Sequence, residues 1–289
     1  PLFDNIFAAI EKWMRELLTG MVESNMSTMF TDVNEKTSEI AAQVGRTPQN
    51  WNSSVFSMIQ NLSESVVVPI AGIIITLVLC YELISMLTER NNLHDVDTWM
   101  FFKYFVKAWV AIYLVSNTFT ITMAVFDVGQ SVVNSASGII NGETAIDVSS
   151  LSMQMQAAMA TMEIGELVVL ALETFLVSFC MKIMSVVITV IVYGRMIEIY
   201  LYTSLAPIPF ATMSNREWGH VGTNYFRGLF ALAFQAFLMM VCVAIYAALI
   251  SSVRISSNMH SALIGVAAYT VILCFSLMKT GSLSKQIFG

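Results

Sequence analysis

Five long apolar stretches alternate with polar segments along this chain of 289 residues. A helix needs about 20 mostly apolar residues to span a bilayer, and each stretch approaches or exceeds that length. The pattern therefore predicts an all-α, polytopic helical membrane protein with five transmembrane helices. A sixth helix is the alternative, because the apolar character of residues 167–210 extends over roughly twice the length of one span. The predicted spans lie at about residues 66–87, 101–126, 167–194, 226–250 and 262–278.

The N-terminal segment carries apolar side chains at helical spacing from Phe3 to Met21, with charged residues mostly between them. This spacing predicts an amphipathic helix over residues 2–22, too often interrupted by charge to span a membrane. We expect it to lie on a membrane surface or to pack against another subunit. The subunit is favoured because the polar face is not rich in lysine. The polar residues 23–54 predict a connecting region outside the membrane.

The central segment, residues 127–165, contains no Lys or Arg. Basic residues favour the cytoplasmic side of membrane loops, so this segment is predicted to be an extracytoplasmic loop, with a helix over residues 150–166 in its second half. Five spans then place the N-terminus outside and the C-terminus inside the cytoplasmic membrane. Six spans would put Arg216, Arg227, Lys279 and Lys285 outside, which fits the rule less well. The predicted organisation is an extracytoplasmic N-terminal region with the amphipathic helix (1–65), transmembrane helices 1 and 2 (66–126), the central loop (127–165) and a C-terminal transmembrane region (166–289).

Composition narrows the class of function. Apolar residues make up 56% and charged residues 12% of the chain, against about 45–50% and about 25% in soluble proteins. The net charge of −6 argues against a dedicated nucleic-acid binder, which needs a concentrated basic surface. The sequence has no HExxH motif, Gly-rich phosphate loop, Gly-x-Ser-x-Gly elbow or metal-ligand spacing of cysteines. We therefore expect no enzymatic activity, no cofactor and no metal.

Charged residues inside or at the ends of the apolar stretches are the candidate lumen or inter-helix sites, because a charge at the bilayer centre costs about 2.5–3.5 kcal/mol. Glu173 and Lys182 are nine positions apart, near opposite faces of one helix, so each needs water or a partner on another helix. Arg195 and Glu198 are three positions apart and can pair with each other. The full set is Glu82, Glu173, Lys182, Arg195 and Glu198.

Two prolines, Pro207 and Pro209, are predicted to end any helix before Phe210. Residues 204–250 join this helix break to a polar turn and an aromatic-rich apolar span. In this combination the stretch resembles the polytopic inner-membrane subunit of conjugation machines, the TrbL-like family of type IV secretion systems. The resemblance is strongest over about residues 160–289 and more general before that. The turn contains Arg216, Glu217, Trp218 and Gly219.

The resemblance implies a channel and scaffold component that helps pass a relaxase–single-stranded DNA complex, or protein, across the cytoplasmic membrane as a homo-oligomer. It also implies contacts with lipid, with other secretion-system membrane subunits and ATPases, and transiently with the substrate. The candidate docking surface for ATPases or substrate comprises Arg216, Glu217, Trp218, His220 and Arg227. An ordinary membrane-interface turn, with Trp218 and Tyr225 in the aromatic belt, is the alternative.

Two other classes of function stay open beside this one. A secondary transporter would use Glu82, Glu173, Lys182 and Glu198 as a proton or ion relay. The chain lacks the two related halves that such transporters often show, which disfavours this class. The other class is a pore-forming or lysis protein, which would be toxic when overproduced alone.

Overall fold

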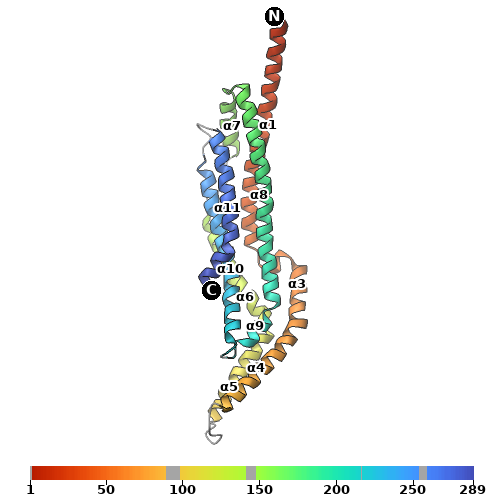
Figure 1. Ribbon diagram of the computed structural model, residues 1–289, viewed down its shortest axis with the longest axis vertical. Coiled ribbons are helices and arrows are strands. Elements are labelled where there is room, and N and C mark those ends of the chain that lie inside the picture. Colours follow the sequence, from red (N-terminus) through yellow and green to blue (C-terminus); the bar gives the residue numbers. More distant parts are fainter. Residues whose placement is uncertain (1, 89–97, 141–147, 216, 254–258) are drawn as a thin grey trace. The chain divides into compact units, whose positions relative to one another are not determined.

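The structure is a computed structural model that describes residues 2–88, 98–140, 148–215, 217–253 and 259–289. Within these ranges the chain is helical apart from short connections, and no strand occurs among them (Figure 1). The all-α prediction is confirmed. The helices are α1 (Leu2–Val44), α2 (Pro48–Trp51), α3 (Ser53–Leu62), α4 (Val68–Thr88), α5 (Thr98–Ser116), α6 (Thr118–Ile140), α7 (Val148–Met159), α8 (Ile164–Ser204), α9 (Pro207–Thr212), α10 (Gly219–Ser251) and α11 (Met259–Phe288), and a π-helical turn at Ser63–Val67 joins α3 to α4.

Five helical segments of the described chain are long and apolar enough to cross a membrane, which confirms the predicted class. The sixth span would need a separate helix at about residues 195–213. Instead, α8 continues through Arg195 to Ser204, and α9 has only six residues. The five segments are Ser53–Thr88, Thr98–Ser116, Ile164–Ser204, Gly219–Ser251 and Met259–Phe288.

Helix α1 is about twice as long as the predicted amphipathic helix. It continues to Val44, so the prediction of a connecting region over residues 23–54 is wrong for most of that stretch. The reason is a second apolar stripe, whose members are at most 4% exposed. Their burial outweighs the weak helix preference of the Ser, Thr and Asn residues between them. The stripe comprises Val22, Met26, Phe30, Val33 and Ile40.

The predicted second span, residues 101–126, is interrupted at Asn117. Helix α5 ends before this residue and α6 begins after it. The Thr118 hydroxyl donates to the backbone carbonyls of Leu114 at 2.8 Å and Val115 at 2.9 Å. Hydroxyls that bond the preceding helical turn in this way often bend helices.

The predicted central loop at residues 127–165 is largely helical, because α6 extends to Ile140 and α7 follows at Val148–Met159. The composition of its first half, rich in Ser, Gly and Asn, is typical of a loop, whereas α7 agrees with the helix predicted over residues 150–166. Apolar residues within the segment are nevertheless buried, with Val133 at 1% and Met155 at 2% exposure. Residues 141–147, which include Glu143 and Asp147, lie outside the described residues.

The chain forms two compact units, each assembled from several parts of the sequence. Unit 1 contains residues 1–44, 135–192 and 239–279, and unit 2 contains residues 45–134, 193–238 and 280–289. The sequence pattern, by contrast, divides the chain into consecutive segments. The membrane side assigned to those segments stays a prediction.

Within unit 1, α1 and α8 run parallel. Asn25 donates to the Thr174 hydroxyl at 3.4 Å, and Lys36 donates to the Thr189 hydroxyl at 3.1 Å. Residues further along α1 therefore meet residues further along α8, and Figure 1 shows the two helices side by side. The second half of α1 thus lies against the apolar part of a predicted membrane span.

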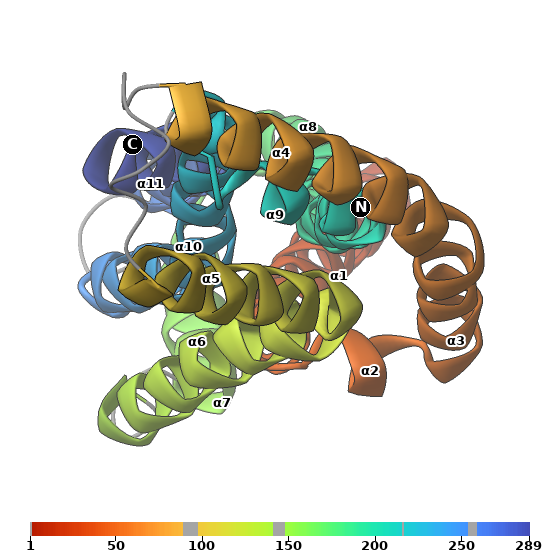
Figure 2. The same cartoon turned by 90° about the horizontal axis from the view of Figure 1, so that it is seen from below.

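Within unit 2, α9 lies between α4 and α5 (Figure 2). A separate close contact joins α6 to α10, where a Cβ on Gly129 would lie 2.9 Å from the Ala233 carbonyl oxygen. Small residues allow such close approach of membrane helices. The apolar core around α9 includes Ala71, Ile75, Leu79, Ala111, Val115 and Phe210.

Candidate functional site

Three of the predicted charged residues contact a basic side chain on another helix. In each pair a glutamate meets a lysine or histidine, and the Glu198–Lys285 pair measures 3.0 Å between Oε1 and Nζ. These side chains are 24–56% exposed, so each pair lies at the edge of a helix contact rather than in a closed core. The pairs are Glu82 with Lys107 across α4 and α5, and Glu173 with His260 and Glu198 with Lys285 across α8 and α11.

Arg195 is buried inside unit 2, with 7% of its side chain exposed. Its Nη2 donates to the Leu232 carbonyl on α10 at 3.4 Å. Among the described residues, no acceptor bonds its Nε. The predicted local pair with Glu198 is replaced by the Glu198–Lys285 contact, because Arg195 points into the helix packing while Glu198 lies near the surface. Lys182, in contrast, is exposed on α8.

Asn215 organises the polar turn between α9 and α10. Its Oδ1 accepts the backbone N–H groups of Glu217 at 2.7 Å and Trp218 at 3.2 Å. Its Nδ2 donates to the Glu82 carboxylate at 3.3 Å, so it joins the turn to the Glu82–Lys107 pair. The candidate docking residues did not include Asn215, although an Asn that bonds the backbone two residues ahead is a common turn former.

The predicted docking residues of this turn divide into two groups. Glu217 and Trp218 are held against α4, where the Tyr81 hydroxyl donates to the Glu217 carboxylate at 3.0 Å and the Tyr81 and Trp218 rings stack with centroids 5.6 Å apart. His220 and Arg227 are exposed on α10. Arg216 lies outside the described residues.

The helix break at the prolines is a change from one helix to another. Helix α8 ends at Ser204, whereas Pro207, Pro209 and Phe210 all belong to α9. The long helix therefore ends before Phe210, as predicted, but a short second helix that includes Phe210 begins at Pro207. Proline fits the first turn of a helix, where its missing N–H has no intrahelical acceptor.

Two tyrosines form a reciprocal contact beside this break. The rings of Tyr202 and Tyr225 stack with centroids 4.5 Å apart. The Tyr225 hydroxyl donates to the Tyr202 carbonyl at 2.8 Å, and the Tyr202 hydroxyl donates to the Tyr225 carbonyl at 3.2 Å. No spacing signal in the sequence identifies this pair, because its members lie on different helices.

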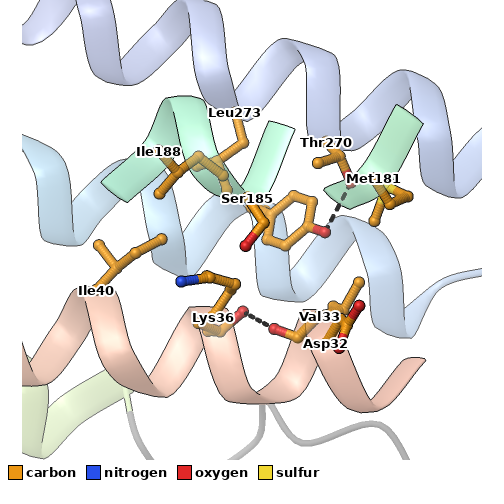
Figure 3. Close-up of a pocket in the computed structure, with 11 residues that line it drawn as sticks. Asp32, Val33, Lys36, Ile40, Met181, Ser185, Ile188, Thr270 and Leu273 are labelled. Atoms are coloured by element: carbon orange, nitrogen blue, oxygen red, sulfur yellow. Dashed lines mark hydrogen bonds between the residues drawn. The ribbon is translucent and has the colours of Figure 1, made fainter. Parts of the chain in front are cut away.

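A cavity in unit 1 brings together side chains of α1, α8, α10 and α11 (Figure 3). Its volume is about 20 Å³, room for about one water molecule. Lys36 enters it from α1, where the ammonium group contacts Glu39 and donates to Thr189. On the opposite side, the Tyr246 and Thr270 hydroxyls are 2.8 Å apart. The cavity was missed because the sequence pattern placed this part of α1 outside the bundle.

The described ranges contain no cluster of three or more His, Cys, Asp or Glu side chains that could hold a metal ion. The glutamate–basic pairs within these ranges instead lie at separate helix contacts, where they join helices to one another.

Comparison with known proteins finds a family whose model matches this chain. The model of the family described as "TrbL/VirB6 plasmid conjugal transfer like protein" matches residues 33–207. The match lies further towards the N-terminus than the resemblance in residues 204–250 suggested. A search of curated proteins finds no match, and a search of solved structures finds none. Because the family model covers more than half of the 289 residues, the chain belongs to the TrbL/VirB6 family of plasmid conjugal transfer-like proteins.

Proposed function

We propose that this multi-pass membrane protein is a channel and scaffold subunit of a type IV secretion system. It acts as a homo-oligomer in the cytoplasmic membrane and helps pass relaxase-bound single-stranded DNA, or protein, out of the cell. Family membership supports the role in conjugal transfer. The arrangement of intramembrane charges supports a scaffold and channel rather than a solute transporter.

The observation that carries this choice is the one-to-one pairing of glutamates with basic residues on neighbouring helices. Secondary transporters gather their polar groups around a substrate site near the bilayer midplane. Here Glu82, Glu173 and Glu198 each have a partner of their own, and the cavity in unit 1 has room for about one water molecule. Charges used in this way fix helix positions, as a scaffold requires.

The exposed apolar surface supports lipid as the surroundings of the chain. On α8 the outward side chains include Phe175 at 58%, Phe179 at 56%, Val186 at 64% and Val190 at 65% exposure. Contiguous apolar surface of this kind marks membrane or protein contacts. We place this face of α8 against lipid.

A topology with the N-terminus outside and the C-terminus inside fits the contacts in unit 1. Arg15 on α1 donates to the Met162 carbonyl at 2.8 Å, and Glu23 accepts from Gln156 on α7 at 2.7 Å. The N-terminal region therefore lies on the same membrane side as residues 148–163. Three of the five candidate spans follow residues 148–163, so the C-terminus lies on the opposite side. The absence of Lys and Arg in the central segment places that shared side outside.

The proposed role in a type IV secretion system also determines the partners and the substrate that we assign to the chain. We assign the ATPases and other membrane subunits of the machine as partners, with the turn around Trp218, His220 and Arg227 as their docking surface. Basic residues are few in this acidic chain. Contact with single-stranded DNA is therefore weak and transient, because tight binding depends on cationic groups along the backbone.

Deletion of the gene followed by complementation tests this function. We expect deletion to abolish conjugal DNA transfer without loss of viability, and the wild-type chain to restore it. Normal transfer in the deletion strain would refute the proposal. Killing of cells that overproduce the chain alone, with transfer unaffected by the deletion, would identify a pore-forming or lysis protein instead.

A further inference from the structure

The second half of helix α1 has two opposite faces, and only one of them is covered by the described residues of its own chain, whereas residues 4–13 are exposed on every side. The buried face holds the apolar stripe that packs into unit 1. The outward face has positions that alternate by four and three residues and so repeat every seven. In the first half of the helix this face is apolar, and apart from the half-buried Met14 its members are 45–68% exposed. These positions are Phe7, Ile10, Met14, Leu17 and Met21.

The same alternation continues through the second half of α1, where every position on it is again exposed. Here the residues are small or polar. We call the whole outward stripe, from Phe7 to Ala42, the α1 seam. Its second half comprises Ser24, Thr28, Thr31, Glu35, Ser38 and Ala42.

A seven-residue repeat of this kind has a specific structural meaning. A straight helix has 3.6 residues per turn, so a seam repeating every 3.5 residues stays on one side only when helices wind around each other. Packing on a sheet, or on one flat surface of a larger protein, does not require the strict repeat. The repeat is therefore typical of a face that packs against other helices.

The second half of the seam lies at the depth of a membrane span. Asn25 and Lys36 bond Thr174 and Thr189 of α8, and these two threonines bracket most of residues 175–192. That run of α8 has Lys182 as its one charged residue. Lipid solvates the outward apolar face of α8, but it does not solvate the exposed carboxylate of Glu35 on α1. The polar half of the seam must therefore face water or protein inside an assembly.

We infer that the α1 seam is the surface through which copies of this chain assemble around a common axis. This rests on the proposed homo-oligomer and identifies the helix at its centre. All copies have the same membrane orientation, so their α1 helices are parallel and identical positions meet at the same height. The apolar half joins the helices as a parallel coiled coil, and the polar half lines a water-filled path through the membrane.

Cysteine cross-linking in native membranes tests this assignment. In a background with Cys80, Cys180, Cys242 and Cys274 replaced by Ala and shown to transfer DNA, Leu17→Cys probes the apolar half and Thr31→Cys the polar half. Val186→Cys on the exposed face of α8 is the matched control. On oxidation we expect disulfide-linked homodimers from both seam variants and none from the control. A charged, membrane-impermeant thiol reagent should label Thr31→Cys and leave Val186→Cys unlabelled.

The possible outcomes separate this inference from the proposed function. If the purified chain is a ring but neither seam variant cross-links, the seam assignment is wrong and the homo-oligomer stands. If the chain is monomeric and does not cross-link, both are wrong. Cross-links to a different subunit instead of a second copy would also overturn the assignment. Cross-linking at Leu17 with Thr31 unlabelled would overturn the water-filled path, and Ser38→Cys repeats that test where Thr31→Cys fails to accumulate.

Discussion

The contact between Glu173 on α8 and His260 on α11 distinguishes the proposed scaffold from a transporter, because the two functions require different properties of the side chain at position 173. A proton or ion relay needs an ionisable side chain at this position. A helix contact needs only a group that can hydrogen-bond the imidazole, which an amide supplies.

We therefore expect Glu173→Gln to keep DNA transfer within about twofold of the wild type, because a partly exposed hydrogen bond contributes little net stability. Transfer frequency between donor and recipient cells measures this. Glu173→Leu, which removes the hydrogen bond, serves as the comparison. Complete loss of transfer in Glu173→Gln at normal protein levels would favour the relay.

Gly228 gives space to the reciprocal tyrosine contact. A Cβ at this position would lie 2.1 Å from the Tyr202 hydroxyl, so Gly228→Ala must displace that ring. We expect a loss of about 1–3 kcal/mol, the usual cost of overpacking. Gly194→Ala is the control, because nothing lies within 4 Å of its Cβ. Thermal unfolding in detergent should show a lower Tm for Gly228→Ala and no loss for Gly194→Ala; equal Tm values would contradict the packing described.

At the scale of elements, the turn between α9 and α10 has two candidate roles, to anchor the helix ends or also to dock a partner. A pair of variants distinguishes these roles. Tyr81→Ala and Trp218→Ala each remove one side of the same ring stack. If the turn only anchors the helix ends, both should lower Tm and transfer by similar amounts. If Trp218 also docks a partner, Trp218→Ala should reduce transfer about tenfold or more beyond Tyr81→Ala, as expected for an aromatic anchor in an interface.

The exposed faces of α1 and α8 predict opposite tolerance to charge. Val186→Asp places a carboxylate on the lipid-facing surface of α8, at a cost of about 2.5–3.5 kcal/mol. Thr31→Asp places the same group on the polar half of the α1 seam. We expect Val186→Asp to lower the amount of protein in the membrane fraction and Thr31→Asp to leave it near the wild-type level. Equal loss in both variants would mean that the two faces share one environment.

The number of spanning helices could be predicted, because a continuous apolar stretch of sufficient length is the property that membrane insertion requires. The second half of α1 could not. Its buried stripe, including Met26 and Val33, is interrupted by so many Ser, Thr and Asn residues that only the tertiary contacts show it to be helical. The continuation of α8 past Arg195 has a similar cause, because the charge is buried against a carbonyl on α10.

The charged candidate sites could be named from the sequence but not paired. Glu82, Glu173 and Glu198 stand out as charges near or within apolar runs. Their partners lie 25 to 87 positions away, and a single sequence carries no signal that links such distant residues. The same holds for the tyrosine pair, whose geometry depends on the break at α9.

At the scale of the whole molecule, the chain combines an exposed apolar surface on α8 with an exposed polar stripe on α1 within one compact unit. A monomer in a bilayer would leave the polar stripe in contact with lipid. In the proposed assembly of several copies, the polar stripes would face one another around a water-filled path, which would remove that conflict. The chain belongs to a family described by conjugal transfer, a process that requires a path for its substrate through the membrane.

Electron microscopy of the purified protein in mild detergent tests this account most directly. We expect a closed ring of identical chains with a water-filled lumen, bordered by α1, and with the apolar face of α8 turned to the detergent. A compact monomer with a closed cavity around Glu173 and Lys182 would contradict the channel and restore the transporter as the leading function.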